Sequence, residues 1–302
     1  MHLPAGSLDN LTCTVTTLLA AGATGYAVKQ ARASAGDWQP AKLGAVAAFV
    51  FAVQMVNYPV AAGVSGHMVG GVLAGALLGP WLGLLAMALV LVVQCLLAGD
   101  GGLSTLGANI LTMGVVATWG GAALRHLIST RTGTNPVLRL LTTAAAAWGS
   151  IVAAGVVCAA IWSLGSTAAF ADVLGPMTAI HARIGIGEAL ITAMALAAVE
   201  LWSANPAGSR RGAAIALAAA VGVAAFLAPW ASPSPDGLEH VASAWVTWPE
   251  GTLAFAPLPD YLLPGIQNEL LATALAGVIG TLVVFGVGSA SGRAVVLAPK
   301  SK

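Results

Sequence analysis

The sequence predicts an all-α protein, a polytopic transmembrane helical bundle with little surface that could face water. Of its 302 residues, 58% are hydrophobic and only 8% are charged, whereas soluble domains carry about a quarter charged residues. Its 37 glycines suit membrane helices, which pack closely through small side chains. The net charge of +1 and the lack of a basic run give no indication of nucleic-acid binding.

Nine apolar stretches can be identified on the rule that about 20 apolar residues span the hydrocarbon core. The third is short and interrupted by glycines, so we expect a half-span or a segment buried within the bundle. In chain order, the predicted helices are residues 9–28, 41–60, 68–79, 81–98, 106–124, 137–165, 177–203, 212–230 and 267–288.

The loop charges favour nine spans, with the N-terminus outside the cell and the C-terminus in the cytoplasm. Under this count, 11 of the 12 basic residues lie on the inner side, and Arg183 is the exception. Such a bias is typical of cytoplasmic loops. The outer loops would instead carry acidic residues, namely Asp9, Asp100, Asp172, Asp236, Glu239, Glu250, Asp260 and Glu269.

The predicted helices divide into two parts at the short polar stretch 205–211, which has the composition of a linker. Residues 1–204 form a seven-helix body, and residues 205–302 form an appendix with two helices. The outer loop of the appendix, residues 231–266, is rich in Pro and Trp, so we expect it to be compact and ordered. The three cysteines lie in apolar segments and are interpreted as small buried side chains, namely Cys13, Cys95 and Cys158.

The chain begins MHLPAGSL, with no basic segment, apolar segment or cleavage site ahead of the first helix. We expect Met1 to be retained, because His2 is not a small residue. A terminal X-His unit offers the α-amine, the amide of residue 2 and the imidazole as three nitrogen ligands in one plane. Planar nitrogen coordination suits Ni(II) or Cu(II) better than Zn(II), which prefers a tetrahedron. Alone, however, a histidine at position 2 is a weak signal.

His67 is the candidate for a fourth ligand, because it lies at the predicted outer end of the third helix. Its glycine neighbours would let another backbone approach closely. The alternative is a packed or interfacial histidine that bonds to a carbonyl. Two other histidines, His126 and His240, are predicted to be loop residues.

Glu188 is the one carboxylate placed clearly inside a predicted span, and such groups are functional candidates by default. It lies seven residues after His181, about two turns along one face of a helix. Pairing with His181 or Arg183, or indirect support of the metal site, is favoured over direct metal ligation.

The glycine-rich stretch from Asp100 to Asn109 is predicted to form an outer turn before the fifth helix. It lacks the Lys-Ser/Thr ending of a phosphate-binding loop and does not follow a strand. Any ATP-derived energy would therefore come from another chain. We expect this turn to pack over the metal site, with Asn109 and Ser104 as supporting polar groups.

Together these motifs resemble the CbiM/NikM-type substrate-binding membrane components of energy-coupling factor nickel and cobalt transporters. The motifs are the Met-His start, SGHMVGGVLAGALLGP at 65–80, VQCLLAGDGGLSTLGAN at 93–109 and HARIGIGEAL at 181–190. In the C-terminal part, SPDGLEHVA at 234–242 and PLPDYLLPG at 257–265 resemble the PDGLE module of the same transporters.

The resemblance implies that Met1, His2 and His67 bind the metal through the amine, the amide and the two imidazoles. It also implies a seven-helix body, a transmembrane coupling subunit and a pair of cytoplasmic ATPases as partners, and a PDGLE module that assists metal loading or release. The family often has an acidic residue at position 5, where this chain has Ala5. Asp9 is the nearest carboxylate that could replace it.

The expected function is capture of Ni(II), or of Co(II), and its uptake across a bacterial cytoplasmic membrane. The ion is cargo rather than a cofactor, and the chain is not expected to be an enzyme. One alternative is an ion-coupled secondary transporter or channel. Such proteins usually show inverted repeats and midplane charges, but this chain shows no clear internal repeat and has at most Glu188 and Glu200 as membrane carboxylates. Another is an intramembrane zinc protease, which would need an HExxH-like pair that the sequence lacks.

Overall fold

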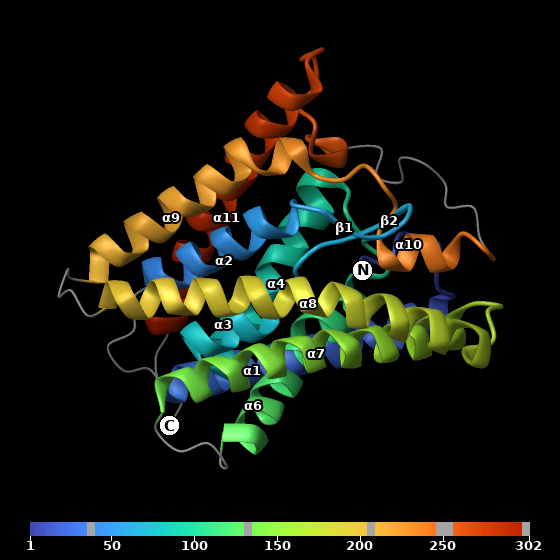
Figure 1. The fold of residues 1–302 in the computed structure, drawn as a ribbon, viewed down its shortest axis with the longest axis horizontal. Coiled ribbons are helices and arrows are strands. Elements are labelled where there is room, and N and C mark those ends of the chain that lie inside the picture. The colour runs from blue at the N-terminus through green and yellow to red at the C-terminus, as the bar shows by residue number, and fades with distance from the viewer. Residues whose placement is uncertain (35–39, 130–134, 204–208, 246–255, 298–302) are drawn as a thin grey trace.

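The computed structural model describes residues 1–34, 40–129, 135–203, 209–245 and 256–297, which form an almost entirely helical bundle (Figure 1). Within the described residues, seven helical segments are long and apolar enough to cross a membrane. They are α1 (Asn10–Ala33), α4 (Pro80–Val93) continued by the π-helical turn η1 (Gln94–Ala98), α5 (Leu106–Asn109) continued by η2 (Ile110–Gly120) and α6 (Gly121–Ser129), α7 (Pro136–Gly165), α8 (Phe170–Ser203), α9 (Ser209–Phe226) with η3 (Ala228–Trp230), and α11 (Glu269–Leu297).

Two shorter helices, α2 (Pro40–Gln54) and α3 (Gly71–Leu78), complete the bundle. The glycine-interrupted third segment is therefore short, as predicted. The prediction of a helix over residues 41–60 is wrong at its C-terminal end. The observed helix α2 ends at Gln54, and a β-hairpin follows it. This hairpin pairs β1 (Tyr58–Ala61) antiparallel with β2 (Val64–Gly66). Gly63 turns the chain with a positive φ of 69°, a conformation that glycine adopts without strain.

α8 begins at Phe170, seven residues before its predicted start, and Pro176 lies inside it. A proline within a membrane helix is tolerated where neighbouring groups satisfy the backbone that it frees. The remaining apolar stretches also form helices, because long hydrophobic runs leave few alternatives to a helix in lipid. However, α1, α6 and α11 continue beyond their predicted ends, to Ala33, Ser129 and Leu297.

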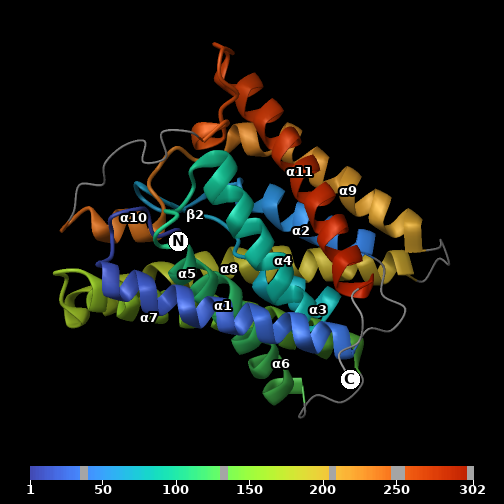
Figure 2. The ribbon, with the colours of Figure 1, turned by 180° about the vertical axis from the view of Figure 1, so that it is seen from behind.

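The last two long helices, α9 and α11, pack against α2, while α7 runs along α8 on another side of the molecule (Figures 1 and 2). Glycines allow the closest approach between α2 and α11. A β-carbon on Gly44 would lie 2.5 Å from the carbonyl oxygen of Phe285, and one on Gly288 would lie 2.8 Å from the Cα of Gly44. Close helix packing through small residues is the usual way in which membrane helices associate.

The N-terminal residues turn into the bundle instead of projecting from it, and the N-terminus lies near α5, β2 and α10 (Figure 2). Met1 and Leu3 are buried, with 4% and 0% of their surface exposed. Two short helices of the C-terminal region, α10 (Gly237–Ala242) and η4 (Pro259–Tyr261), belong to the outer loop predicted at 231–266. Residues 246–255 of that loop, and most of the predicted linker at 205–211, lie outside the described residues.

Candidate metal centre

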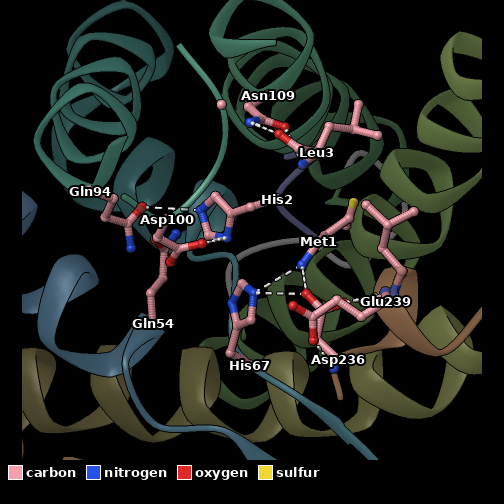
Figure 3. A network of polar contacts seen from close by, with 12 residues as sticks. Met1, His2, Leu3, Gln54, His67, Gln94, Asp100, Asn109, Asp236 and Glu239 are labelled. Carbon is pink, nitrogen blue, oxygen red and sulfur yellow. Dashed lines mark hydrogen bonds and ion pairs between the residues drawn. The ribbon is translucent and has the colours of Figure 1, made fainter. Parts of the chain in front are cut away.

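The structure brings Met1, His2 and His67 together at the buried end of the N-terminal segment (Figure 3). The Met1 amine nitrogen lies 3.1 Å from Nε2 of His67. The rings of His2 and His67 are stacked, with centroids 5.4 Å apart and an interplanar angle of 20°. The three residues that the sequence analysis singles out thus come from two distant segments and meet at one place.

These distances are compatible with neighbouring ligands of one ion. Two nitrogens that bind a metal at about 2 Å and at right angles are about 2.9 Å apart, close to the observed separation of the amine and His67. In the described part of the chain, no three side chains of His, Cys, Asp or Glu are grouped so that they could hold an ion. The candidate set instead combines two imidazoles with the terminal amine and an amide.

The glycine-rich turn holds the N-terminal segment through the backbone of Leu3. Asn109 accepts a hydrogen bond from the Leu3 amide at 2.8 Å and donates one to its carbonyl at 3.2 Å. Thr105 donates to the same carbonyl at 2.6 Å. A β-carbon on Gly102 would lie 2.3 Å from the Ala5 amide nitrogen, so only glycine lets the two backbones pass. The supporting role predicted for Ser104 is wrong, because Ser104 is exposed and Thr105 makes the contact.

Two side chains from the same region contact the His2 imidazole. Oε1 of Gln94 lies 3.2 Å from Nε2 of His2, and Oδ1 of Asp100 lies 3.1 Å from its Nδ1. Gln94 begins the π-helical turn η1, and π-helical turns are frequent at functional sites. Nδ1 is the ring nitrogen that closes a six-membered chelate with the His2 amide. Asp100 therefore lies beside the nitrogen that would bind the ion.

The loop that carries His67 is fixed from two helices. His67 itself donates from Nδ1 to the Met68 carbonyl at 3.0 Å, which leaves the lone pair on Nε2, the atom nearest the Met1 amine. Glu188 on α8 accepts hydrogen bonds from the amides of Val69 and Gly70 at 2.6 and 2.9 Å. Pairing of Glu188 with His181 or Arg183 is thus not what the structure shows. The buried carboxylate supports the His67 loop instead.

The C-terminal region contributes Asp236, which forms an ion pair with the Met1 amine and lies 3.9 Å from Nε2 of His67. Its other oxygen caps α10, accepting from the amide of Glu239 at 2.9 Å, and Glu239 completes a capping box. Ser65 on β2 donates its amide to the Pro235 carbonyl at 2.9 Å. The cap and this backbone bond fix the carboxylate beside two candidate ligands.

Burial and the neighbouring charges set the protonation of these groups. Burial, with the positive Met1 amine and His2 nearby, lowers the pKa of His67 to about 3. Burial likewise lowers the pKa of His2, against the attraction of Asp100. Burial alone would also lower the pKa of the Met1 amine, but the carboxylates around it, Asp236 first, raise it overall. Both imidazoles are therefore neutral near pH 7 and available to a metal, while the amine holds a proton.

Several other residues weighed in the sequence analysis do not join the centre. Asp9 caps α1 by accepting from the Thr12 amide at 2.7 Å, so it does not replace a carboxylate at position 5. His126 lies on α6, and His240 is exposed on α10. The sequence analysis missed Gln94 and Asp236. A glutamine inside an apolar helix and an Asp that opens a capping box were the available signals.

Family models match both parts of the chain. Residues 2–207 match the model described as the cobalt uptake substrate-specific transmembrane region, CbiM, and residues 210–297 match the PDGLE domain. An Archaeoglobus fulgidus protein, provisionally named a fused nickel transport protein NikMN, is 34% identical over 97% of this chain and 98% of its own length. The fused nickel transport protein NikMN of Rhodobacter capsulatus is 27% identical, with 97% of each chain covered.

Solved structures show the same fold over about two thirds of the chain. A crystal structure titled as a transition metal transporter is 28% identical, with a TM-score of 0.61, and the match covers 68% of this chain and 95% of that one. A truncated transition metal transporter is 29% identical, with a TM-score of 0.59, and the match covers 66% of this chain and 98% of that one.

Proposed function

Because the chain belongs to the cobalt uptake substrate-specific transmembrane (CbiM) family and ends in a PDGLE domain, we propose that it captures Ni(II), or alternatively Co(II), for uptake across the cytoplasmic membrane. It is a multi-pass membrane protein, and its relatives are named for nickel or cobalt transport. The chain would act as the substrate-specific subunit, and its established family gives no indication of an enzyme.

The observation that carries this proposal is the meeting of the Met1 amine and Nε2 of His67 at 3.1 Å, with the ring of His2 stacked on that of His67. We propose four ligands, namely the Met1 amine, the His2 amide, the His2 imidazole and the His67 imidazole. Four nitrogens in a plane favour Ni(II) over ions that need a tetrahedron or an octahedron of oxygen ligands. Co(II) can use the same atoms.

The ion would enter from the outer side, with the N-terminus outside and the C-terminus in the cytoplasm, as the distribution of basic residues favours. Delivery would depend on partners, a transmembrane coupling protein and a pair of cytoplasmic ATPases, as in energy-coupling factor transporters. Residues 1–204 would form the metal-binding body, and residues 205–302 would form the PDGLE module. The contact of Asp236 with Met1 supports a role of this module at the metal site.

The proposal can be tested by Ni(II) binding to the purified full-length protein, with N-terminal sequencing to establish that Met1 is the first residue. We expect His67→Ala to weaken Ni(II) binding by about 100-fold or more, since it removes one of four ligands. One additional residue before Met1 should have an effect at least as large, because it converts the amine into an amide. His240→Ala is the matched control and should bind normally.

Unchanged affinity after the N-terminal extension would show that the amine is not a ligand and would refute the site. The dependence on partners needs a separate measurement, uptake of labelled nickel in cells with and without an ATPase pair. Full uptake without ATPases would favour a secondary transporter or channel instead.

A further inference from the structure

A groove lined by apolar side chains opens on the surface of the bundle, and its lining includes none of the candidate metal ligands. α1 and α11 both pack against α4, and Figure 2 shows α4 between them. The groove has a volume of about 570 Å³, within the range of about 300–1,000 Å³ that is usual for sites of small ligands. Only three lining residues carry a polar side chain, Thr17, Thr24 and Ser291, and none carries a charge.

The length of the groove matches one leaflet of a bilayer. On α1 the lining extends from Thr17 to Val28, about 16 Å at a rise of about 1.5 Å per residue, and Lys29 ends the apolar run. One leaflet contributes about 15 Å of the hydrocarbon core. A partner helix that crossed the membrane would need a surface about twice as long, so the groove suits a lipid chain of one leaflet.

The groove is open to the bilayer from the side. Ala21 on α1 is exposed and lines it, so an acyl chain can enter without displacing a helix. At this depth the bilayer offers no water. An unfilled groove would lose the dispersion contacts along its walls, and hydrocarbon is the material at hand to fill it.

An arginine lies on the groove side of α1, one turn beyond the lining. Thr17, Ala21, Thr24 and Val28 follow one another at intervals of three or four residues, which places them on one face of the helix. Arg32 comes four residues after Val28 and is exposed. The ion pairs between described residues do not include it. A guanidinium binds phosphate through paired hydrogen bonds, so Arg32 is placed for the headgroup of a lipid whose chain fills the groove.

We propose that the groove between α1, α4 and α11 binds one anionic phospholipid of the cytoplasmic leaflet, with an acyl chain along α4 and the phosphate at Arg32. Basic pockets between membrane helices on the cytoplasmic side bind anionic headgroups in other membrane proteins. The lipid would contact both parts of the chain, because α1 lies in the CbiM region and α11 in the PDGLE domain. This inference is independent of the metal site.

The test is lipid binding to the full-length protein, freed of lipid in detergent and followed by native mass spectrometry. Wild type should bind one phosphatidylglycerol about fivefold more tightly than phosphatidylcholine with the same chains, the contribution of one basic residue at a membrane surface. Ala21→Phe fills the groove from its open side and should weaken the binding of both lipids about 10-fold or more, because several methylenes lose their contacts. Ala153→Phe, at an exposed position of α7, is the matched control and should bind both lipids normally.

Arg32→Gln provides a second variant, which should weaken phosphatidylglycerol binding about fivefold and leave phosphatidylcholine binding unchanged. Arg211→Gln, at an exposed arginine near the start of α9, is its control. Normal lipid binding by Ala21→Phe would overturn the groove as a lipid site, and normal phosphatidylglycerol binding by Arg32→Gln would overturn the headgroup position. If Ala21→Phe kept its lipid but no longer assembled with a membrane partner subunit, the groove would belong to a partner helix, and the proposal would be wrong.

Discussion

Two sets of contacts surround the candidate ligands, and they differ in kind. One set of contacts holds the backbone, as where Asn109 bonds to both the amide and the carbonyl of Leu3. The other set acts through ionisable side chains, as where Asp236 pairs with the Met1 amine and Asp100 lies beside Nδ1 of His2. The first kind sets where the ligand atoms lie, and the second sets the charge and protonation around them.

This difference has a consequence for energetics. Removing one partner of a buried backbone group leaves an unpaired amide or carbonyl, which costs about 1–3 kcal/mol. Replacing Asp236 removes a charge that attracts the cation and also one that holds the proton on the Met1 amine, so its two effects on metal binding partly cancel. We therefore expect substitutions in the first set to weaken metal binding more than those in the second.

The largest effect should come from Asn109→Leu. This change leaves the amide of Leu3 unpaired and removes one of the bonds to its carbonyl, so the first three residues lose their fixed position. Ni(II) affinity measured by calorimetry should fall about 100-fold, the equivalent of about 2.7 kcal/mol. Ser104→Ala, on the exposed side of the same turn, is the control and should bind within twofold of wild type.

Glu188→Gln should have the next largest effect, about 10-fold. The carboxylate accepts from two successive amides, those of Val69 and Gly70, and an amide side chain can accept from only one of them without turning its NH2 toward the other. The His67 loop would then be less well fixed. Glu200→Gln, near the end of the same helix, is the matched control. Equal affinities of both variants would contradict a role of Glu188 at the loop.

Much of the fold could be predicted from the sequence, because an apolar run of about 20 residues in lipid has few alternatives to a helix. The error at 41–60 shows the limit. Tyr58-Pro-Val continues the apolar run, and composition alone cannot distinguish a buried hairpin from the end of a helix. The hairpin matters, since β2 leads directly to His67 and bonds to the Pro235 carbonyl.

The candidate ligands could be identified from the sequence, but several of the residues that contact them could not. Met1 and His2 follow from the chelate chemistry of an N-terminal X-His unit, and His67 follows from topology. Asp236 and Gln94 could not be placed, because their contacts join segments 235 and 92 residues apart. Without a known arrangement of the helices, no local pattern specifies such pairs.

Asp236→Asn tests the second set of contacts through pH. Asp236 helps to raise the pKa of the Met1 amine, and this amine must lose its proton to bind a metal, so affinity should rise with pH in wild type. The substitution lowers the pKa of the amine and moves the steep part of the curve to lower pH. Above that range wild type should bind about threefold to tenfold more tightly, because its carboxylate attracts the cation.

The measurement is the Ni(II) dissociation constant at several values between about pH 6 and 9, with Asp172→Asn as the control at an acidic residue away from the centre. The curves of wild type and Asp236→Asn should cross. Parallel curves would mean that Asp236 does not control the protonation of the amine.

Tyr261→Phe should weaken Ni(II) binding least among these substitutions. Its hydroxyl donates to Oδ2 of Asp100 at 2.6 Å, and Oδ1 of Asp100 lies 3.1 Å from Nδ1 of His2, so the tyrosine acts on the site only through another side chain. Phenylalanine keeps the edge-to-face contact with Phe51, whose ring centroid is 6.0 Å away.

Loss of this one hydrogen bond should weaken Ni(II) binding about twofold to fivefold, since the net contribution of a hydrogen bond is about 0.5–1.5 kcal/mol. Tyr58→Phe is the matched control, because the Tyr58 hydroxyl donates to the Ile184 carbonyl rather than to a group at the centre. If Tyr261→Phe weakened binding more than Asn109→Leu, charge placement through Asp100 would outweigh the backbone contacts, and the order proposed for the two sets would be reversed.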